Sequence, residues 1–236
     1  MICIGIADLK VEIDNKYEYL ERFCKKYILQ EAYVPDITVS VSEADIDAEI
    51  SLATEPVSRG YAESICVYRV ICDKVLRNFN GFLLHGALIE YEGRGYLFSA
   101  KSGTGKSTHI SLWRKVFGEA VTVVNGDKPI VRYINGEFVA YGTPWCGKEG
   151  YGNNTSVVLS VICFLERSKD NSIAPLLPSN AVARVFDQVV LPTDIEGFDK
   201  LSSLLDKMLS AVPCYLLGCN MDKEAATVAY NGMNNI

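Results

Sequence analysis

The sequence predicts an α/β protein, a mixed sheet with flanking helices, preceded by an N-terminal α+β extension. Short β-branched runs alternate with segments whose apolar residues recur every three to four positions, which indicates strands alternating with helices. Turn signals at residues 92–95 and 135–136 predict hairpins, and therefore antiparallel strand pairs. A glycine-rich turn at 100–105 lies between an apolar run and a helix-type segment, as in a strand–loop–helix unit.

Length and composition set the broad class. The chain has 236 residues, 22% of them charged, and a net charge of −6. This length suits one large domain or one domain with an appended lobe, and we place a weakly marked boundary near residue 80. No run of Lys and Arg is visible, so we expect no nucleic-acid partner. The sequence leaves a homo-oligomer open.

Cysteine usage and hydropathy address the location of the protein. The eight cysteines form no C-x-x-C pair, and most of them sit in apolar runs, which favours buried thiols in a reducing cytoplasm. We see neither a signal peptide nor an apolar run of 18 residues. The sequence therefore predicts a cytoplasmic protein without a membrane partner.

The first 80 residues predict strands and helices in turn. Residues 1–15 are expected to form one or two strands, 16–28 an amphipathic helix, and 63–79 a longer helix. Residues 35–50 alternate as a strand and then become acidic at Glu43, Asp45, Asp47 and Glu49. The spacing lacks the glycine and the final Glu of a calcium-binding EF-hand loop, so we expect a solvated strand face or loop.

The remaining residues predict the main sheet. A strand at 81–91 is interrupted by His85-Gly86 and returns at 96–98. The further expectations are strands at 121–124, 129–133, 137–141, 157–166 and 213–219, and helices at 109–117, 179–190, 198–211 and 222–230. Gly118 is placed to end the first of these helices.

The turn at residues 100–107 matches the phosphate-binding loop pattern G-x-x-x-x-G-K-[ST], except that Ala100 replaces the first glycine. Glycines let backbone N–H groups curl around an anion, and the following helix adds the positive end of its dipole. Lys106 would supply a charge for the β- and γ-phosphates, and Ser107 a hydroxyl for Mg²⁺. The predicted phosphate-binding residues are Ser102, Gly103, Thr104, Gly105, Lys106, Ser107 and Thr108.

Two further residues belong to this hypothesis. Asp127 follows the strand at 121–124, whose tip a strand–loop–helix–strand unit would place beside the phosphate site. Its carboxylate could hold Mg²⁺ or accept a proton, although Asn125-Gly126-Asp127 is also ordinary turn chemistry. His85 lies in the hairpin that leads into the loop and could take part in proton transfer, or be a core histidine.

The longest loop-like tract covers residues 142–154. Loops of this length in compact domains are usually functional or mobile. Within it, Lys148 could neutralise charge in a transition state and Trp145 could cover an acceptor side chain. The alternative is an exposed loop with a packed tryptophan.

His85-Gly86, the run Ser102 to Thr108, and Gly126-Asp127 occur in an order that resembles the catalytic domain of HPr kinase/phosphorylase. More broadly, they are similar to the kinase fold shared with ATP-dependent phosphoenolpyruvate carboxykinase. The later Gly142-to-Trp145 segment and the ending at 212–217 look like small HPr-kinase-like proteins of bacteria. The resemblance implies a P-loop kinase core over 81–236, the nucleotide-binding catalytic domain.

The same resemblance implies the cofactors and the roles. ATP would bind at Ser102 to Ser107, Ser107 and Asp127 would hold Mg²⁺, and His85, Lys106 and Asp127 would be the catalytic residues. The implied reaction is transfer of the γ-phosphoryl group to a hydroxyl, with a Ser or Thr of a peptide or small protein as acceptor.

The chain departs from the HPr kinase pattern at several points. HPr kinases carry two adjacent Asp residues where this chain has Gly126-Asp127, their arginine-containing signature loop is not evident, and residues 1–80 do not resemble their regulatory domain. Two alternatives therefore stand beside the kinase of a peptide hydroxyl. One is an ATP-binding or sensing module of a peptide-modification complex without chemistry, and the other is a kinase of a small-molecule hydroxyl.

Overall fold

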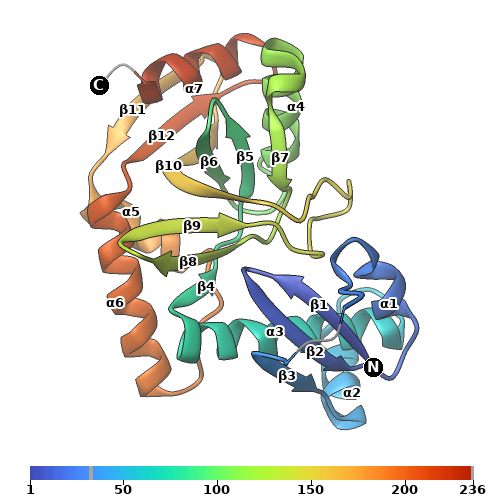
Figure 1. Ribbon diagram of the computed structural model, residues 1–236. Helices are drawn as coiled ribbons and strands as arrows, with labels where there is room; N and C mark the ends of the chain where they lie inside the picture. The colour runs from blue at the N-terminus through green and yellow to red at the C-terminus, as the bar shows by residue number, and fades with distance from the viewer. Residues whose placement is uncertain (32–33, 235–236) are drawn as a thin grey trace.

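The computed structural model describes residues 1–31 and 34–234, and it confirms the α/β class (Figure 1). Within these residues a three-stranded sheet and a curled, mixed nine-stranded sheet are flanked by helices. The small sheet contains β1 (Ile2–Ile6), β2 (Leu9–Asp14) and β3 (Ile37–Ser40). The large sheet contains β4 (Gly81–Leu83), β5 (Ala87–Tyr91), β6 (Arg94–Ser99), β7 (Thr122–Asn125), β8 (Ile130–Ile134), β9 (Glu137–Tyr141), β10 (Ser156–Arg167), β11 (Ser172–Leu176) and β12 (Cys214–Cys219).

The helices cover the two sheets. They are α1 (Tyr19–Phe23), α2 (Glu43–Leu52), α3 (Arg59–Phe79), α4 (Lys106–Phe117), α5 (Pro178–Phe186), α6 (Ile195–Ala211) and α7 (Glu224–Asn234), with 3₁₀ turns at Lys25–Tyr27 and Gly118–Ala120. Side chains of α4 and α7 share a core with Tyr96 and Phe98 of β6. Those of α5 and α6 share another core with Leu97, on the opposite face of the same strand.

Strand β10 joins the two halves of the large sheet. Its first residues, 156–158, pair antiparallel with β9, and its later residues pair parallel with both β6 and β12. The order is β4-β8-β9-β10-β6-β5-β7, with β12 and β11 beyond β10. A strand with neighbours on both sides and helices on both faces is buried throughout, which explains the continuous apolar run of β6 and of late β10.

The hairpin and cap predictions are confirmed. Asn135 and Gly136 have φ values of 51° and 92°, as a two-residue turn between β8 and β9 requires. Strands β5 and β6 pair antiparallel across residues 92 and 93. Helix α4 ends at Gly118, whose φ of 67° favours glycine.

The helix predicted at residues 16–28 is wrong in extent, because only Tyr19–Phe23 and the 3₁₀ turn are helical. The backbone N–H groups of Lys16 and Tyr17 instead donate to the buried carboxylate of Glu63, at 2.5 and 3.2 Å. Tertiary contacts therefore hold the start of this segment outside the helix.

The acidic run at 43–49 is also not a strand face or loop, because it forms α2. Ser42 caps this helix through a capping box with Asp45, a signal that could have been read from Ser-x-x-Asp. Strand β11 was not predicted from the sequence. This strand contains Pro175 and, among the described residues, pairs only with β12. It is therefore an edge strand, the position in a sheet that tolerates proline.

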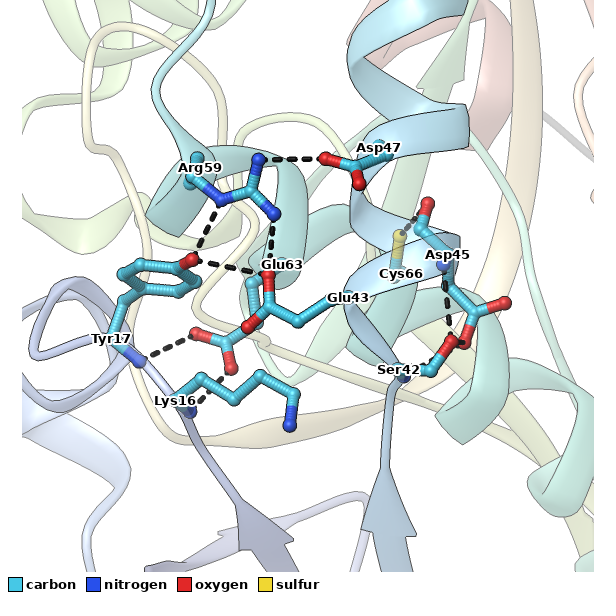
Figure 2. Close-up of polar contacts among 9 residues, drawn as sticks. All are labelled: Lys16, Tyr17, Ser42, Glu43, Asp45, Asp47, Arg59, Glu63 and Cys66. Carbon is cyan, nitrogen blue, oxygen red and sulfur yellow. Dashed lines mark hydrogen bonds and ion pairs between the residues drawn. The ribbon is translucent and has the colours of Figure 1, made fainter.

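Arg59, at the start of α3, makes three polar side-chain contacts in the N-terminal lobe, as Figure 2 shows. Its guanidinium donates to the Tyr17 hydroxyl at 2.7 Å, to Asp47 at 2.6 Å, and to Glu43. Glu43 and Asp47 of α2 thus pair with a cation at the start of α3, and Glu49 pairs with Arg69 further along α3. This use of the carboxylates accounts for the acidic run without a metal.

The N-terminal lobe shares its core with the main sheet. The cluster that contains β1, β2 and α3 side chains also includes Leu83, Ile130, Tyr141 and Trp145. The domain boundary near residue 80 stays a prediction, and this shared core shows that α3 packs on both sides of it.

His109 generates a prediction about stability and pH. Its side chain is buried, and its Nε2 accepts a hydrogen bond from Trp113 Nε1 at 3.0 Å. Burial lowers the pKa of His109 to about 4, whereas a histidine in an unfolded chain has a pKa near 6.5. The unfolded state therefore takes up a proton first as the pH falls, so the stability is complete above about pH 6.5 and is lost toward pH 4.

We expect His109 to reduce the free energy of unfolding by on the order of 2 kcal/mol between pH 7 and pH 5. His109→Gln keeps an acceptor for Trp113 but cannot titrate. Urea unfolding at both pH values should give a shallower pH dependence for the variant than for the wild type. Equal slopes would contradict the assignment.

Candidate functional site

Four chain segments meet at one edge of the large sheet. Strand β6 runs directly into the glycine-rich loop, and β10 is parallel to β6. Strand β7 runs in the same direction, because it and β6 are both antiparallel to β5. The ends of β6, β7 and β10 and the start of β5 therefore lie together, which brings Asp127, His85 and the loop to the same edge.

The conformation of the glycine-rich loop suits an anion. Gly103 and Gly105 have φ values of 77° and 125°, and a Cβ on either would meet no atom within 4 Å. Helix α4 starts at Lys106 with Gly105 as its N-cap, which has no side chain to pair with the first backbone N–H groups. Such N–H groups and the helix dipole favour a phosphate. Ala100 has no positive φ, which explains why alanine is tolerated there.

Lys106 lies folded against this loop. Its ammonium donates to the carbonyl of Ala100 at 2.9 Å, and the residue is 8% exposed. Burial lowers the pKa of Lys106, and the nearby carboxylate of Asp127 opposes this shift. The loop lysine and the predicted metal ligand are therefore close enough to interact. Ser107 is half-buried in the first turn of α4.

Asp127 and His85 form a hydrogen-bonded pair. His85 Nε2 lies 2.9 Å from Asp127 Oδ1, and Lys128 Nζ lies 3.0 Å from Oδ2. Burial raises the pKa of Asp127, but the His85 hydrogen bond and the Lys128 ammonium outweigh it and lower the pKa to about 2. The carboxylate is therefore ionised and a weak proton acceptor, which suits it better to a cation than to the role of general base.

Asn125 fixes the position of this pair and was not singled out from the sequence. Its side-chain oxygen accepts from the N–H groups of Asp127 and Lys128, at 2.9 and 2.7 Å. Its amide nitrogen donates to the Thr143 carbonyl and hydroxyl, each at 3.1 Å. The turn interpretation and the site interpretation of Asn-Gly-Asp are thus compatible, because Asn125 makes the turn and Asp127 extends to His85.

Two more residues were missed from the sequence. Arg167, at the end of β10, donates to the loop carbonyls of Gly103 and Thr104 at 2.5 and 3.4 Å. The Tyr68 hydroxyl, from α3, donates to the Lys128 carbonyl at 2.7 Å. Both contacts depend on the packing of elements that are distant in the chain, so no local sequence pattern indicates them.

The loop at 142–154 lies against the tip of β7. Trp145 is 3% exposed and stacks on Tyr68, with ring centroids 4.2 Å apart. The expectation that Trp145 covers an acceptor is therefore wrong, and the packed-tryptophan alternative holds. Lys148 is exposed, and its contribution to charge neutralisation stays a prediction.

The same loop explains why position 126 is a glycine. The N–H of Gly126 donates to the Tyr151 carbonyl at 2.8 Å. A Cβ at Gly126 would lie 2.6 Å from the Cys146 carbonyl oxygen and 3.1 Å from that of Tyr151. Only glycine fits between these two backbone groups.

A metal ion at this edge would have few protein ligands. The described residues contain no group of three or more His, Cys, Asp or Glu side chains that could hold one. Asp127 and Ser107 offer oxygen donors, which fits Mg²⁺ when phosphate oxygens and water complete the shell. That Asp127 and Ser107 hold Mg²⁺ stays a prediction.

The fold and this edge define an α/β protein with a glycine-rich loop at a helix N-terminus, facing an Asp–His pair. Residues 62–223 match the family described as "ScmC: SynChlorMet cassette protein ScmC". This match spans more than half of the chain, so the protein belongs to the ScmC family.

Comparisons with individual proteins add little to this assignment. A solved structure titled "Structure of the Hpr(Ser) kinase/phosphatase from Coxiella burnetii" matches with a TM-score of 0.38 and 10% identity, over 65% of this chain and 88% of that chain. No curated protein matches the chain. None of the helices in the described residues has both the length and the apolar composition needed to cross a bilayer.

The packing at Gly126 predicts the effect of placing a carboxylate at this position. We expect Gly126→Asp to lower the free energy of unfolding by about 1–3 kcal/mol, because the new Cβ overpacks against the Cys146 and Tyr151 carbonyls. Gly126→Ala should cost a similar amount, since the Cβ causes the clash. Urea denaturation measures both, with Lys148→Ala on the exposed part of the loop as a control near wild type. A Gly126→Asp protein as stable as the wild type would show that a second carboxylate fits.

Proposed function

We propose that the protein is an ATP- and Mg²⁺-dependent kinase that transfers the γ-phosphoryl group to a hydroxyl. One observation carries the proposal: the glycine-rich loop with Lys106 lies at the same sheet edge as the Asp127–His85 pair. Catalysis of phosphoryl transfer rests mainly on positioning and electrostatics, so a phosphate cradle beside a cation-binding carboxylate supplies the main requirements.

Each residue has a role in this proposal. The loop N–H groups and Lys106 would hold the phosphates, and Asp127 with Ser107 would hold Mg²⁺, which neutralises developing charge when bound. His85 would accept the proton of the acceptor hydroxyl. The low pKa of Asp127 supports this division of labour, because a carboxylate with a pKa of about 2 takes up protons poorly.

For the acceptor, we propose a Ser or Thr of a peptide or small protein. The family name describes ScmC as a cassette protein, which favours another product of the same cassette as the partner. A small-molecule hydroxyl is the second choice. We propose neither a phosphorylase activity nor the HPr protein as the acceptor.

A second candidate is an ATP-binding module without chemistry. The single carboxylate at the tip of β7 favours it, because Gly126 leaves no room for a second one. Both functions require nucleotide binding, so they differ only in phosphoryl transfer.

The experiment combines ATP binding with transfer of labelled γ-phosphate to the other proteins and peptides of the cassette. Lys106→Ala should weaken ATP binding or turnover. Asp127→Asn should fold normally but transfer at least about 10²-fold more slowly, because charge neutralisation at the phosphate is lost. Lys115→Ala, exposed on the same helix as Lys106, and Asp206→Asn, exposed on α6, are the matched controls and should behave as wild type.

The outcomes separate the two functions. Tight ATP binding without transfer to any acceptor would reject the kinase and support the ATP-binding module. Failure of the wild type to bind ATP would reject both. If Asp127→Asn transferred the phosphoryl group at the wild-type rate, Asp127 would be a turn residue without a catalytic role.

A further inference from the structure

Exposed apolar side chains gather on helices α5 and α6 and on the segment between them. Of the fourteen large hydrophobic side chains that are exposed in the described residues, six lie within residues 177–198. They are Leu177, Val182, Val190, Leu191, Ile195 and Phe198. Single exposed apolar residues are ordinary on a protein surface, whereas a cluster of them marks an interaction site.

The two helices contribute to one surface. Val182 and Phe186 are four residues apart on α5, so they lie on the same side of the helix. The half-buried ring of Phe186 is 6.0 Å from the ring of Phe198 in the first turn of α6, and Ile195 at the start of α6 is 81% exposed. The α5–α6 surface is defined here by Val182, Phe186, Val190, Leu191, Ile195 and Phe198.

The α5–α6 surface begins next to the candidate site. The carbonyl of Gln188, two residues before Val190, accepts from the N–H of His85 at 2.7 Å. Val189 forms an antiparallel bridge with Leu84. The segment that carries Val190 is therefore attached to the segment that carries His85. A chain bound on this surface would lie beside the residue that we propose as the proton acceptor.

A pocket of about 440 Å³ lies between the end of α5 and the glycine-rich loop. Its lining includes Arg184 and Asp187 from the end of α5, and Lys101 and Thr104 from the loop. The volume is within the range of small-ligand sites, so the pocket has room for one side chain of a bound segment. The α5–α6 surface and the loop are thus connected by a space that a side chain can enter.

Acidic side chains border the α5–α6 surface. Asp187 follows α5, and Glu196 and Asp199 lie near the start of α6; all three are exposed. None of the three carboxylates forms an ion pair with another described residue. Apolar side chains bordered by unpaired carboxylates are complementary to a segment that combines apolar and basic residues.

Two cations on the same helices are engaged elsewhere. Arg184 pairs with Glu166 at 2.7 Å, and the Lys200 ammonium donates to the Arg77 carbonyl at 2.5 Å. Neither neutralises the acidic border. A second copy of the chain docked through the same surface would bring like charges together, which costs affinity. The charge of the border therefore favours a different, basic partner.

We propose that the α5–α6 surface docks the acceptor, a peptide segment with apolar and basic residues beside its Ser or Thr. The inference rests on the proposed kinase function, because it names the class of acceptor for that reaction. The apolar residues of the segment pack on Ile195 and Phe198, and its Lys or Arg residues pair with the acidic border. The attachment of this surface to the His85 segment then holds the hydroxyl on the side of the proposed base.

The test measures the binding of two short synthetic peptides by fluorescence anisotropy. Each contains one Ser among Leu residues, and the remaining positions are Lys in one peptide and Glu in the other. The wild type should bind the Lys peptide roughly 10-fold or more tightly than the Glu peptide. Ile195→Ser and Phe198→Ser should each weaken binding of the Lys peptide roughly 10-fold, the scale of one apolar anchor.

The controls are exposed apolar residues outside the α5–α6 surface. Leu52 on α2 and Met221 before α7 are 76% and 77% exposed. Leu52→Ser and Met221→Ser should bind the Lys peptide as the wild type does, and all four variants should retain wild-type ATP affinity and urea unfolding. In the transfer reaction, Ile195→Ser and Phe198→Ser should raise KM for the Lys peptide and leave kcat unchanged, because only docking is lost.

Several results would overturn the inference. Wild-type protein that binds neither peptide, or both equally, would do so, as would Lys-peptide affinity that Ile195→Ser and Phe198→Ser leave unchanged. A dimer in sedimentation that Phe198→Ser dissociates would assign the surface to a second copy of the chain. Binding of the Lys peptide through this surface without phosphoryl transfer to any acceptor would reject the kinase and support the docking surface alone.

Discussion

The candidate site depends on one buried amide, that of Asn125. Its oxygen holds the N–H groups of Asp127 and Lys128, and its nitrogen holds Thr143, whose hydroxyl donates in turn to the Lys128 carbonyl at 2.8 Å. Asn125 and Thr143 are fully buried, so breaking any of these hydrogen bonds would leave an unpaired polar group in the interior. This network fixes the backbone of Asp127 where its carboxylate meets His85.

The same network connects the site to the N-terminal lobe. The Lys128 carbonyl accepts from both Thr143 and Tyr68, and Tyr68 comes from α3 and stacks on Trp145. The lobe is therefore part of the wall behind the Asp127 turn. Changes in the packing of α3 would therefore alter the site through the Tyr68 hydroxyl and the Trp145 indole ring.

The sequence was sufficient for those parts of the fold and the candidate site that depend on local chemistry. The glycine-rich loop, the Asn135-Gly136 hairpin and the end of α4 at Gly118 follow from φ preferences that few residues satisfy. The sequence was insufficient where contacts with residues distant in the chain determine the local conformation. The N–H groups of residues 16 and 17 bind Glu63 and so lie outside the predicted helix, and Arg167 reaches the loop only because β10 lies beside β6. Trp145 was ambiguous for the same reason, since its partner Tyr68 is far away in the chain.

The single carboxylate at this edge, that of Asp127, affects the charge balance of the site more than the positions of its residues. Each oxygen of Asp127 already has one partner, His85 on Oδ1 and Lys128 on Oδ2. A carboxylate oxygen has two lone pairs, so Asp127 retains acceptor capacity toward a cation without losing His85. A second carboxylate at position 126 would add negative charge at this edge, but the Cys146 carbonyl occupies that space. Lys106 and Lys128 therefore face one negative side chain, a balance that favours an anionic ligand at this edge.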